Sequence, residues 1–354
     1  MATENRLRVK RSSCFMILAM CFCVALLGCK PASEPSLVLY VSADDVLVRH
    51  VVARFEAKTG IQVQVVGDSE INKTTGLVNR IIAERNNPLA NVFWSSECFM
   101  MMKLADAGVL APSTSSITQQ HPAHMRDSGN RWFAFAARAR VIVYSSDRVS
   151  EDELPTRWSD LADPKFKGRI AMADPRFGTT RGHLGAMQAW WDEHPDSGNY
   201  YEYVDALIAN GVHVLTTGNA GVVQAVANGQ ADFGMTDTDD VWASQRNGLA
   251  VELLYPAHGT PGVPGEGTLL IPNTIALVAG GSNPESAQQF VDFMLSDEVE
   301  RMLAASESRN VPMDPQLAAE FSELAVPDPL DVDLRAAAAA MDDAVSYFVE
   351  RAEH

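Results

Sequence analysis

The amino-acid sequence predicts an α/β protein built around mostly parallel sheets. Short apolar runs typical of buried strands alternate along the chain with segments whose apolar residues recur at helical spacing. Such alternation predicts parallel strands that are covered by helices on both faces. The chain has 354 residues, and the roughly 325 that follow an N-terminal leader usually divide into two domains.

Residues 1–28 have the pattern of a secretory signal peptide. Four basic residues precede an apolar segment, residues 14–27, which is shorter than the ~20 residues that a membrane span needs. The segment ends in the run LLGC, in which Gly28 precedes Cys29. This run resembles the lipobox of bacterial lipoproteins, which implies cleavage before Cys29, lipidation of its thiol and a membrane-anchored, extracytoplasmic protein. A secretory peptide with a chance cysteine, or an uncleaved anchor, is the alternative.

Composition limits what the rest of the chain can be. Four of the five cysteines lie in the leader or at the lipidation position, so Cys98 is left alone and no intramolecular disulfide is expected. The formal net charge of the chain is −17 and the leader contributes +3, so the mature part is near −20. Such acidity argues against nucleic acid as a partner and against electrostatic attraction to anionic lipid. No apolar run of ~18 residues follows Cys29, so no second span is expected.

The first part of the mature chain follows a polar spacer, residues 29–36. Apolar residues spaced three or four apart predict helices, which Gly60 and Gly108 help to end. The expected strands are residues 37–41, 61–66 and 90–94, and the expected helices are residues 45–58, 74–85 and 99–107.

The same alternation continues to the C-terminus. A glycine- and proline-rich stretch, residues 258–267, reads as a loop. The expected strands are residues 139–144, 170–173, 212–215, 231–235 and 269–278, and the expected helices are residues 182–191, 200–209, 220–227, 284–295, 298–305 and 332–351.

Six segments in one order carry a resemblance to a known family. They are LYVSADDVLVRHVVARFEAKTGIQV, ANVFWSSECFMMMKLADAGVLAP, ARARVIVYSSDRV, WSDLADPKFKGRIAMADP, AVANGQADFGMTDTDDVW and SAQQFVDFMLSDEVERMLA. Together they resemble the solute-binding proteins of ABC importers, and specifically the ferric-iron-binding branch of the type II periplasmic-binding-protein fold. The resemblance covers essentially the whole mature chain.

This resemblance implies two α/β lobes with a ligand in the cleft between them and a hinge of two crossing strands, near residues 138–140 and 269–273. Such sheets bind ligands in crevices at strand ends and helix N-termini, and the lobes would close about the hinge. Lobe 1 would comprise residues 36–138 plus 271–320, and lobe 2 would comprise residues 139–270 plus 321–354.

The family's iron ligands map onto this sequence only in part. The histidine of the first strand falls at or near Asp44, and the glutamate after the third strand falls at Ser96 or Glu97. The adjacent tyrosine pair falls within residues 236–240, where the sequence is TDTDD. Phenolates supply much of the ferric binding in that family, so the chain departs from the pattern at the tyrosinate site. The metal ligands that remain to be expected are Asp44, Glu97 and Asp239.

Polar side chains follow three of the expected strands at their C-terminal ends. Carboxylates and hydroxyls at such positions suit a hard cation, or the amine and hydroxyl groups of an organic solute. Helix capping is the alternative, but it explains one residue per loop rather than four polar or acidic residues in five. The candidate ligand-binding residues in these places are Ser42, Asp44, Ser96, Glu97, Asp237, Thr238, Asp239 and Asp240.

A second group of candidates lies at residues 178–183, with the sequence GTTRGH, between a strand and a helix. Free backbone N–H groups, the hydroxyls of Thr179 and Thr180 and the guanidinium of Arg181 would suit an anion. The alternative is that a threonine only caps the helix. In the family the corresponding loop holds the anion that accompanies iron. Arg138 and Arg140, at one crossing, could reach the same anion or could pair with the acidic surface. Asn273, at the other crossing, could donate to the ligand or could satisfy the backbone.

An enzyme is not expected, because the sequence has neither G-x-S-x-G nor H-E-x-x-H. A secreted hydrolase, or a sensor that presents its solute to a signalling receptor, is the alternative. We expect a monomeric binding lipoprotein at the cell membrane, or at the outer membrane facing the periplasm. It would deliver a small polar solute to an ABC permease and its ATPase. That solute is ferric iron with a synergistic anion, or an anionic organic compound such as a phosphorylated or phosphonate compound.

Overall fold

The computed structural model describes residues 36–43, 45–67 and 73–353. The predicted signal peptide, the lipidation position Cys29 and the candidate ligand Asp44 therefore lie outside the described residues. Contacts between residues group the chain from Ser36 onward into one unit. Among the described helices, none has the length and apolarity that crossing a membrane requires.

The strands form a mixed sheet in the order β2-β1-β3-β10-β5-β8-β6-β7. In its first half, β1 is parallel to β2 and β3, and β10 runs antiparallel to β3. The strands of this half are β1 (Ser36–Val41), β2 (Gln62–Val66), β3 (Val92–Ser95), β4 (Leu110–Ala111) and β10 (Leu270–Val278). In the second half, β6 is parallel to β7 and β8, while β5 runs antiparallel to β8 and β9. Its strands are β5 (Phe133–Ser145), β6 (Ile170–Ala173), β7 (His213–Leu215), β8 (Phe233–Asp237) and β9 (Val251–Leu254).

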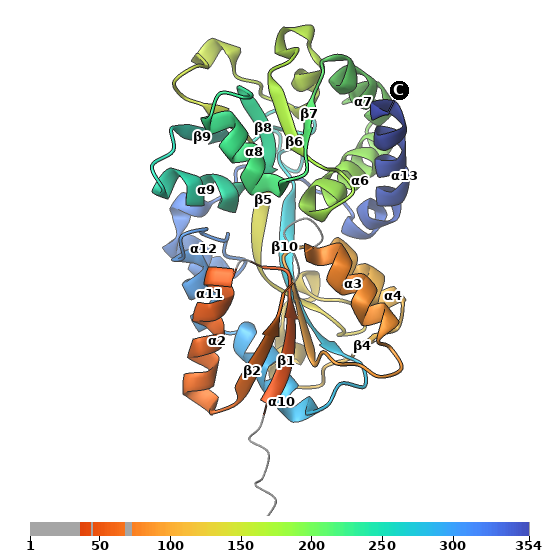
Figure 1. Cartoon of the computed structure of the whole chain (residues 1–354), viewed down its shortest axis with the longest axis vertical. Helices are drawn as coiled ribbons and strands as arrows, with labels where there is room; N and C mark the ends of the chain where they lie inside the picture. Colours follow the sequence, from red (N-terminus) through yellow and green to blue (C-terminus); the bar gives the residue numbers. More distant parts are fainter. Residues whose placement is uncertain (1–35, 44, 68–72, 354) are drawn as a thin grey trace, which may run out of the picture. The chain divides into compact units, whose positions relative to one another are not determined.

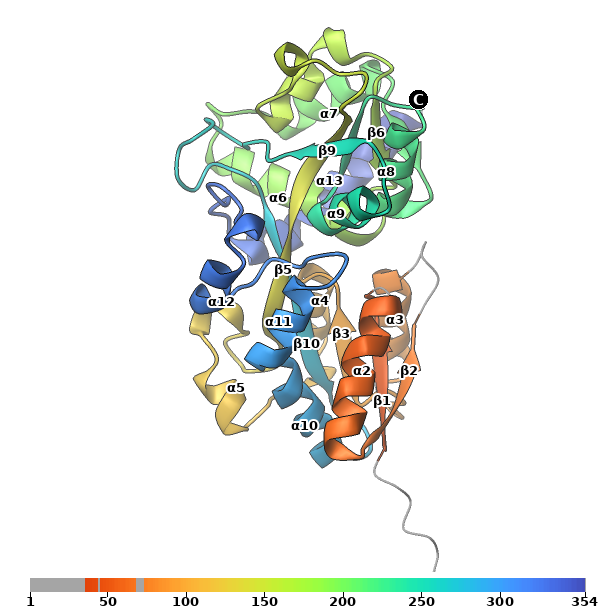
Figure 2. The ribbon, with the colours of Figure 1, turned by 90° about the vertical axis from the view of Figure 1, so that its left-hand side faces the viewer.

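Strand β5 belongs to both halves of the sheet (Figures 1 and 2). Its first part pairs with β10, and from Arg140 onward it pairs with β8. The register between β5 and β10 shifts between Asn273 and Thr274. A register shift of this kind bends the strand locally and re-aims its side chains. The crossings that the resemblance implies, near residues 138–140 and 269–273, fall in β5 and around the start of β10.

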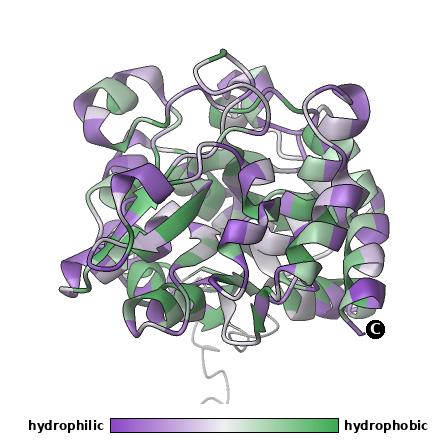
Figure 3. Ribbon diagram, turned by 90° about the horizontal axis from the view of Figure 1, so that it is seen from above, coloured by the Kyte–Doolittle hydropathy of each residue, from purple (hydrophilic) through white to green (hydrophobic). Residues whose placement is uncertain are grey.

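Helices cover both faces of each half-sheet. Around the first half, the ring of Phe55 on α2 meets the ring of Phe290 on α10 edge-on, at a centroid distance of 4.9 Å. The helices of this half are α2 (Asp45–Thr59), α3 (Lys73–Ala83), α4 (Phe99–Asp106), α5 (Ser116–Gln120), α10 (Pro284–Met294), α11 (Asp297–Ala304) and α12 (Pro315–Glu320). Around the second half they are α6 (Gly178–Glu193), α7 (Tyr200–Ala209), α8 (Gly218–Ala227), α9 (Thr238–Arg246) and α13 (Leu334–Ala352). Figure 3 shows green, apolar ribbon mainly among the inner strands and helix faces, and purple mainly on outer segments.

The last helix, α13, packs closely along α6. A Cβ atom on Gly185 would lie 2.4 Å from the carbonyl oxygen of Ala337, so only glycine permits this approach. One turn earlier, a Cβ atom on Gly182 would lie 2.2 Å from the ring of Phe99 on α4. Helix α6 therefore contacts helices of both half-sheets along one glycine-containing face.

The structure differs from the predicted elements mainly around the polar loops. Helix α6 begins at Gly178 rather than at residue 182, because its first turn needs no apolar residues and the periodicity starts later. Residues 237–240 were predicted as loop positions and no helix was predicted over residues 238–246, but this segment forms α9, in which Val241 is the one buried apolar side chain. Strand β5 starts six residues earlier than predicted, at Phe133, and β9 was not predicted.

Candidate functional site

A cavity with a volume of about 360 Å³ lies between elements of the two half-sheets. The first half contributes the ends of β1 and β3 and the start of α3, through Ser42, Ala43, Thr74 and Ser96. The second half contributes most of the wall, and Arg138 lies between the two. The polar lining residues of the second half are Asp174, Thr179, Thr180, Thr216, Asn219, Gln224, Asp237, Asp239, Asp240, Ser244 and Asn247.

Three helices begin on this wall without a side-chain cap. The residues that precede α6, α8 and α9 are Phe177, Thr217 and Asp237, and none accepts a capping hydrogen bond through its side chain. By contrast, Asn199 and Asp333 cap α7 and α13, which begin elsewhere. The first N–H groups of a helix have no partner within the helix, and the helix dipole is positive there. Each of these helix starts therefore favours a negatively charged group, and Asp239 and Asp240 already lie in the first turn of α9.

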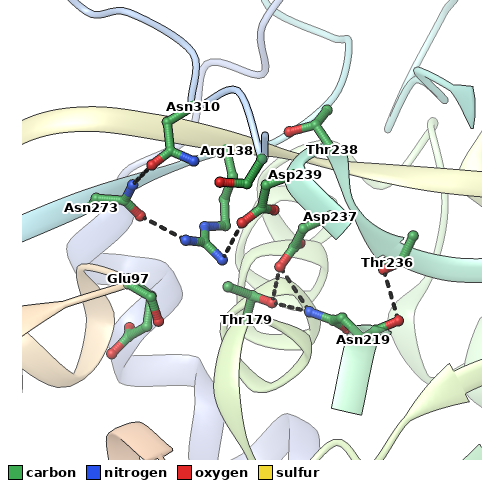
Figure 4. A network of polar contacts seen from close by, with 12 residues as sticks. Glu97, Arg138, Thr179, Asn219, Thr236, Asp237, Thr238, Asp239, Asn273 and Asn310 are labelled. Atoms are coloured by element: carbon green, nitrogen blue, oxygen red, sulfur yellow. Dashed lines mark hydrogen bonds and ion pairs between the residues drawn. The ribbon is translucent and has the colours of Figure 1, made fainter. Parts of the chain in front are cut away.

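The carboxylate of Asp237 joins these three helix ends (Figure 4). One oxygen accepts a hydrogen bond from Arg140 Nη1 at 2.7 Å. The other accepts hydrogen bonds from Thr179 Oγ1 at 2.5 Å and from Asn219 Nδ2 at 2.8 Å. Asp237 ends β8 and precedes α9, whereas its three partners come from β5, α6 and α8. We call these four residues the Asp237 hub.

The centre of the hub is the ion pair between Arg140 and Asp237. This pair is buried, because both side chains are fully inaccessible to solvent. A buried carboxylate is tolerated when its charge is paired and its oxygens accept hydrogen bonds, as they do here. Both oxygens of Asp237 are engaged by protein donors, although the residue lies on the cavity wall. The geometry therefore makes Asp237 a positioning residue that holds the ends of α6, α8 and α9 together.

A second ion pair lies nearer the cavity surface. Arg138 Nη1 lies 2.9 Å from Asp239 Oδ2, and Arg138 Nη2 donates to Asn273 Oδ1 at 3.2 Å. Asn273 in turn donates to Asn310 Oδ1 at 2.9 Å. Figure 4 shows this chain running from α9 across β5 and β10 to the segment after α11. It links the cavity wall to both strands that join the half-sheets.

Glu97 does not face the cavity. Its carboxylate accepts a hydrogen bond from the backbone N–H of Met100 at 3.0 Å and one from Ser95 Oγ at 3.3 Å. The side chain of Glu97 thus accepts a backbone hydrogen bond in the first turn of α4. Burial, partly offset by these hydrogen bonds, raises the pKa of Glu97 to about 7.

The cavity brings together seven of the residues predicted from the sequence, and five described ones lie off its wall. Arg140 belongs to the hub and Asn273 supports Arg138. Thr238 accepts a hydrogen bond from the backbone N–H of Ala139, and Arg181 pairs with Asp342 on α13. The predicted residues on the wall are Ser42, Ser96, Thr179, Thr180, Asp237, Asp239 and Asp240. Those off it are Glu97, Arg140, Arg181, Thr238 and Asn273.

The start of α8 is the part of the wall that sequence reasoning missed. Thr216, Gly218 and Asn219 line the cavity, and Asn219 also belongs to the hub. A signal was present, because TTGNAG follows a strand and opens a helix, as GTTRGH does. The side chain of Asp174, which pairs with Arg176, was also missed.

Metal-binding groups are present but already engaged. Asp237, Asp239 and Asp240 each offer an oxygen atom, and these atoms lie within 4.8 Å of one another. Two of the three carboxylates are paired with arginines in the structure. No tyrosine is among the described residues that line the cavity. Tyr200 donates its hydroxyl hydrogen bond to the carbonyl of Ala344, away from the cavity.

Comparison with known proteins gives a consistent result. The family model described as bacterial extracellular solute-binding protein matches residues 87–333. Iron uptake protein A1 of Synechocystis sp. is 25% identical over 284 residues, covering 77% of this chain and 75% of that protein. The Fe(3+)-binding periplasmic protein of Serratia marcescens is 26% identical over 308 residues, covering 84% of this chain and 85% of that protein.

Solved structures share the fold. The crystal structure of iron-bound HitA from Pseudomonas aeruginosa has a TM-score of 0.75 and 25% identity to this chain. The match covers 90% of this chain and 99% of that one. This likeness confirms the predicted fold class, an α/β protein of the two-lobe periplasmic-binding type.

We expect Asp237→Asn to destabilise the protein strongly, because Arg140 would keep a buried charge without its counter-ion. The expected loss in free energy of unfolding is about 3–5 kcal/mol, measured by urea denaturation. Asp147→Asn makes the same chemical change at an exposed turn and should alter stability by less than about 0.5 kcal/mol. Similar losses for the two variants would contradict the assigned role of the hub.

Glu97 should make stability depend on pH. Its pKa rises from 4.5 to about 7 on folding, so the folded state binds this proton more tightly. The stabilisation of the folded state by protonated Glu97 is complete below pH 4.5 and is lost as pH rises through 7. In urea denaturation, the free energy of unfolding of Glu97→Gln relative to that of wild type should therefore rise by about 3 kcal/mol between pH 4.5 and pH 8. Glu151→Gln, at an exposed position, should show no such trend, and a pH-independent difference for Glu97→Gln would refute the assignment.

Proposed function

The chain belongs to the family of bacterial extracellular solute-binding proteins, and we propose that it captures cargo for an ABC importer. Like its relatives, it is a binding protein and not an enzyme. The cargo would be a small solute that occupies the cavity between the half-sheets. A volume of about 360 Å³ falls within the usual range of small-ligand sites.

The convergence of three uncapped helix starts carries the proposal for the cargo's charge. The starts of α6, α8 and α9 direct positive dipole ends to one wall, and the residue that precedes each helix makes no side-chain cap. The guanidinium of Arg138 lies on the same wall, whereas the hydroxyls of Thr179 and Thr180 donate to Asp237 and Asn219. We infer an anionic organic solute, such as a phosphorylated or phosphonate compound. Its hydroxyl or amine groups would lie near Asp239 and Asp240.

Ferric iron with an accompanying anion is the second candidate. The relatives named for iron uptake and Fe(3+) binding favour it, and the three aspartates offer the oxygen ligands that a hard cation prefers. The absence of tyrosine among the described lining residues argues against the strongly coloured tyrosinate complex. Glu97 is an unsuitable ligand in the observed arrangement, because its carboxylate is held by the first turn of α4.

The remaining proposals concern the setting of the protein. Cys29 would carry lipid, hold the monomer at a bacterial membrane and keep it near a permease and its ATPase. Lobe 1, residues 36–138 plus 271–320, would close on lobe 2, residues 139–270 plus 321–354, about β5 and β10. A closed form would dock on the permease. A sensor that hands its solute to a signalling receptor would use the same cavity.

A thermal-shift panel tests the cargo. We expect anionic organic solutes such as glucose 6-phosphate and methylphosphonate to raise the melting temperature, because a ligand that binds only the folded state stabilises it. Ferric iron should be tested with and without phosphate, and neutral glucose and simple amines serve as controls.

Three results of the panel would change the proposal. A shift with ferric iron alone would favour the second candidate. An intense visible band of an iron complex would mean that phenolates reach the metal after all. No shift with any compound would reject a small-solute function.

Lipid anchoring is tested by fractionating cells that produce the full chain. Cys29→Ser should move the protein from the membrane fraction to the soluble extracytoplasmic fraction and abolish palmitate labelling, because the thiol is the lipidation site. Cys98→Ser should keep both properties, since Cys98 is buried in the fold. Unchanged membrane association of Cys29→Ser would refute the anchor.

A further inference from the structure

Arg138 carries the positive charge of the cavity wall. Among the described residues that line the cavity, it is the one with a cationic side chain. Its side chain is 12% exposed, and that of its partner Asp239 is 5% exposed. The pair therefore lies where an incoming solute can meet it, unlike the fully buried pair of Arg140 and Asp237.

The two aspartates differ in how firmly they are held. Asp237 accepts hydrogen bonds from three elements and holds helix ends in place. Asp239, two residues later, lies in the first turn of α9 and forms an ion pair with Arg138. In this position Asp239 presents to the guanidinium the same group that an anionic solute would present.

We propose that Asp239 is a built-in counter-ion that an anionic cargo displaces from Arg138, which makes this pair the specificity-determining contact of the cavity. The inference rests on the proposed function and deepens it. A guanidinium on a mostly buried wall needs a negative partner at all times. A phosphate, phosphonate or carboxylate can supply one and can accept two parallel N–H bonds. A neutral solute cannot, so the existing ion pair would exclude it.

The surroundings of both residues suit such an exchange. Asn273, itself held by Asn310, keeps a hydrogen bond to Arg138 on the side away from Asp239. The guanidinium would thus stay in place when its counter-ion changes. Asp239 lies at the positive end of the α9 dipole, where a released carboxylate remains stabilised. It could then accept hydrogen bonds from a hydroxyl or amine of the same solute.

The class of cargo follows from this exchange. A solute must outcompete a carboxylate that is already in place, so a doubly charged oxyanion is favoured over a singly charged one. A second group that donates hydrogen bonds to Asp239 would add to the preference. The pair therefore selects oxyanions that also carry hydroxyl or amine groups.

A double-mutant cycle tests the exchange, with affinity measured by isothermal titration calorimetry. The probes are inorganic phosphate, methylphosphonate and glucose 6-phosphate. Asp239→Asn should bind the best of these probes about tenfold more tightly than wild type, since the competing charge is gone. Arg138→Gln should bind it at least tenfold more weakly. In the Arg138→Gln background, Asp239→Asn should give no gain, because there is no guanidinium left to release.

Two controls separate this exchange from other effects. Asp147→Asn removes the same charge from an exposed turn outside the cavity and should leave affinity unchanged. Thermal unfolding of each variant shows whether it is folded, and the conservative Asp239→Asn variant keeps the test valid if Arg138→Gln does not fold.

The outcomes are distinguishable. An unchanged or lower affinity for Asp239→Asn, an equal gain for Asp147→Asn or an additive cycle would overturn this inference while leaving the anionic cargo intact. If wild type and all variants bind none of the three probes, the anionic cargo itself is rejected and the exchange with it.

Discussion

The buried ion pair between Arg140 and Asp237 is the interaction on which the cavity depends. The two residues face each other across β5 and β8, so the sheet register itself brings them together. Because neither charge can reach solvent, each must keep its partner, and the carboxylate satisfies its second oxygen with Thr179 and Asn219. Starts of three helices are thereby fixed to one strand pair. The cavity wall is the surface that this arrangement leaves open.

The proposed anionic cargo is compatible with a strongly acidic chain. Residues 29–354 carry a net charge near −20, yet exposed charges more than ~10 Å away are largely screened by salt. Local groups then decide the potential at the wall, namely the helix ends, one accessible guanidinium and the aspartates that line the cavity. The acidic surface would slow the approach of anions rather than prevent their binding.

Sequence reasoning located the framework well and the polar elements less well. Strands such as β1 and β6 are short apolar runs, and helices such as α2 have regular apolar spacing. The residue pattern therefore predicts which of their faces are buried. Helix α9 was missed because its first turn is made of polar residues, which line the cavity or bond to neighbouring strands rather than form an apolar face. The candidate wall residues were found where polar side chains follow strands. Whether a side chain faces the cavity depends on helix phase and on partners distant in sequence, as Glu97 and Arg181 illustrate.

The position of β10 and α13 near the end of the chain has a consequence for how the protein matures. Strand β10, residues 270–278, lies between β3 and β5, and α13 covers α6 only after residue 334 has been made. Neither half-sheet can be completed from the N-terminal residues alone, and contacts between segments far apart in sequence form slowly. A nascent chain of this design stays incompletely folded until synthesis is nearly finished. Such a delay would leave the chain unfolded for the export that the proposed extracytoplasmic location requires.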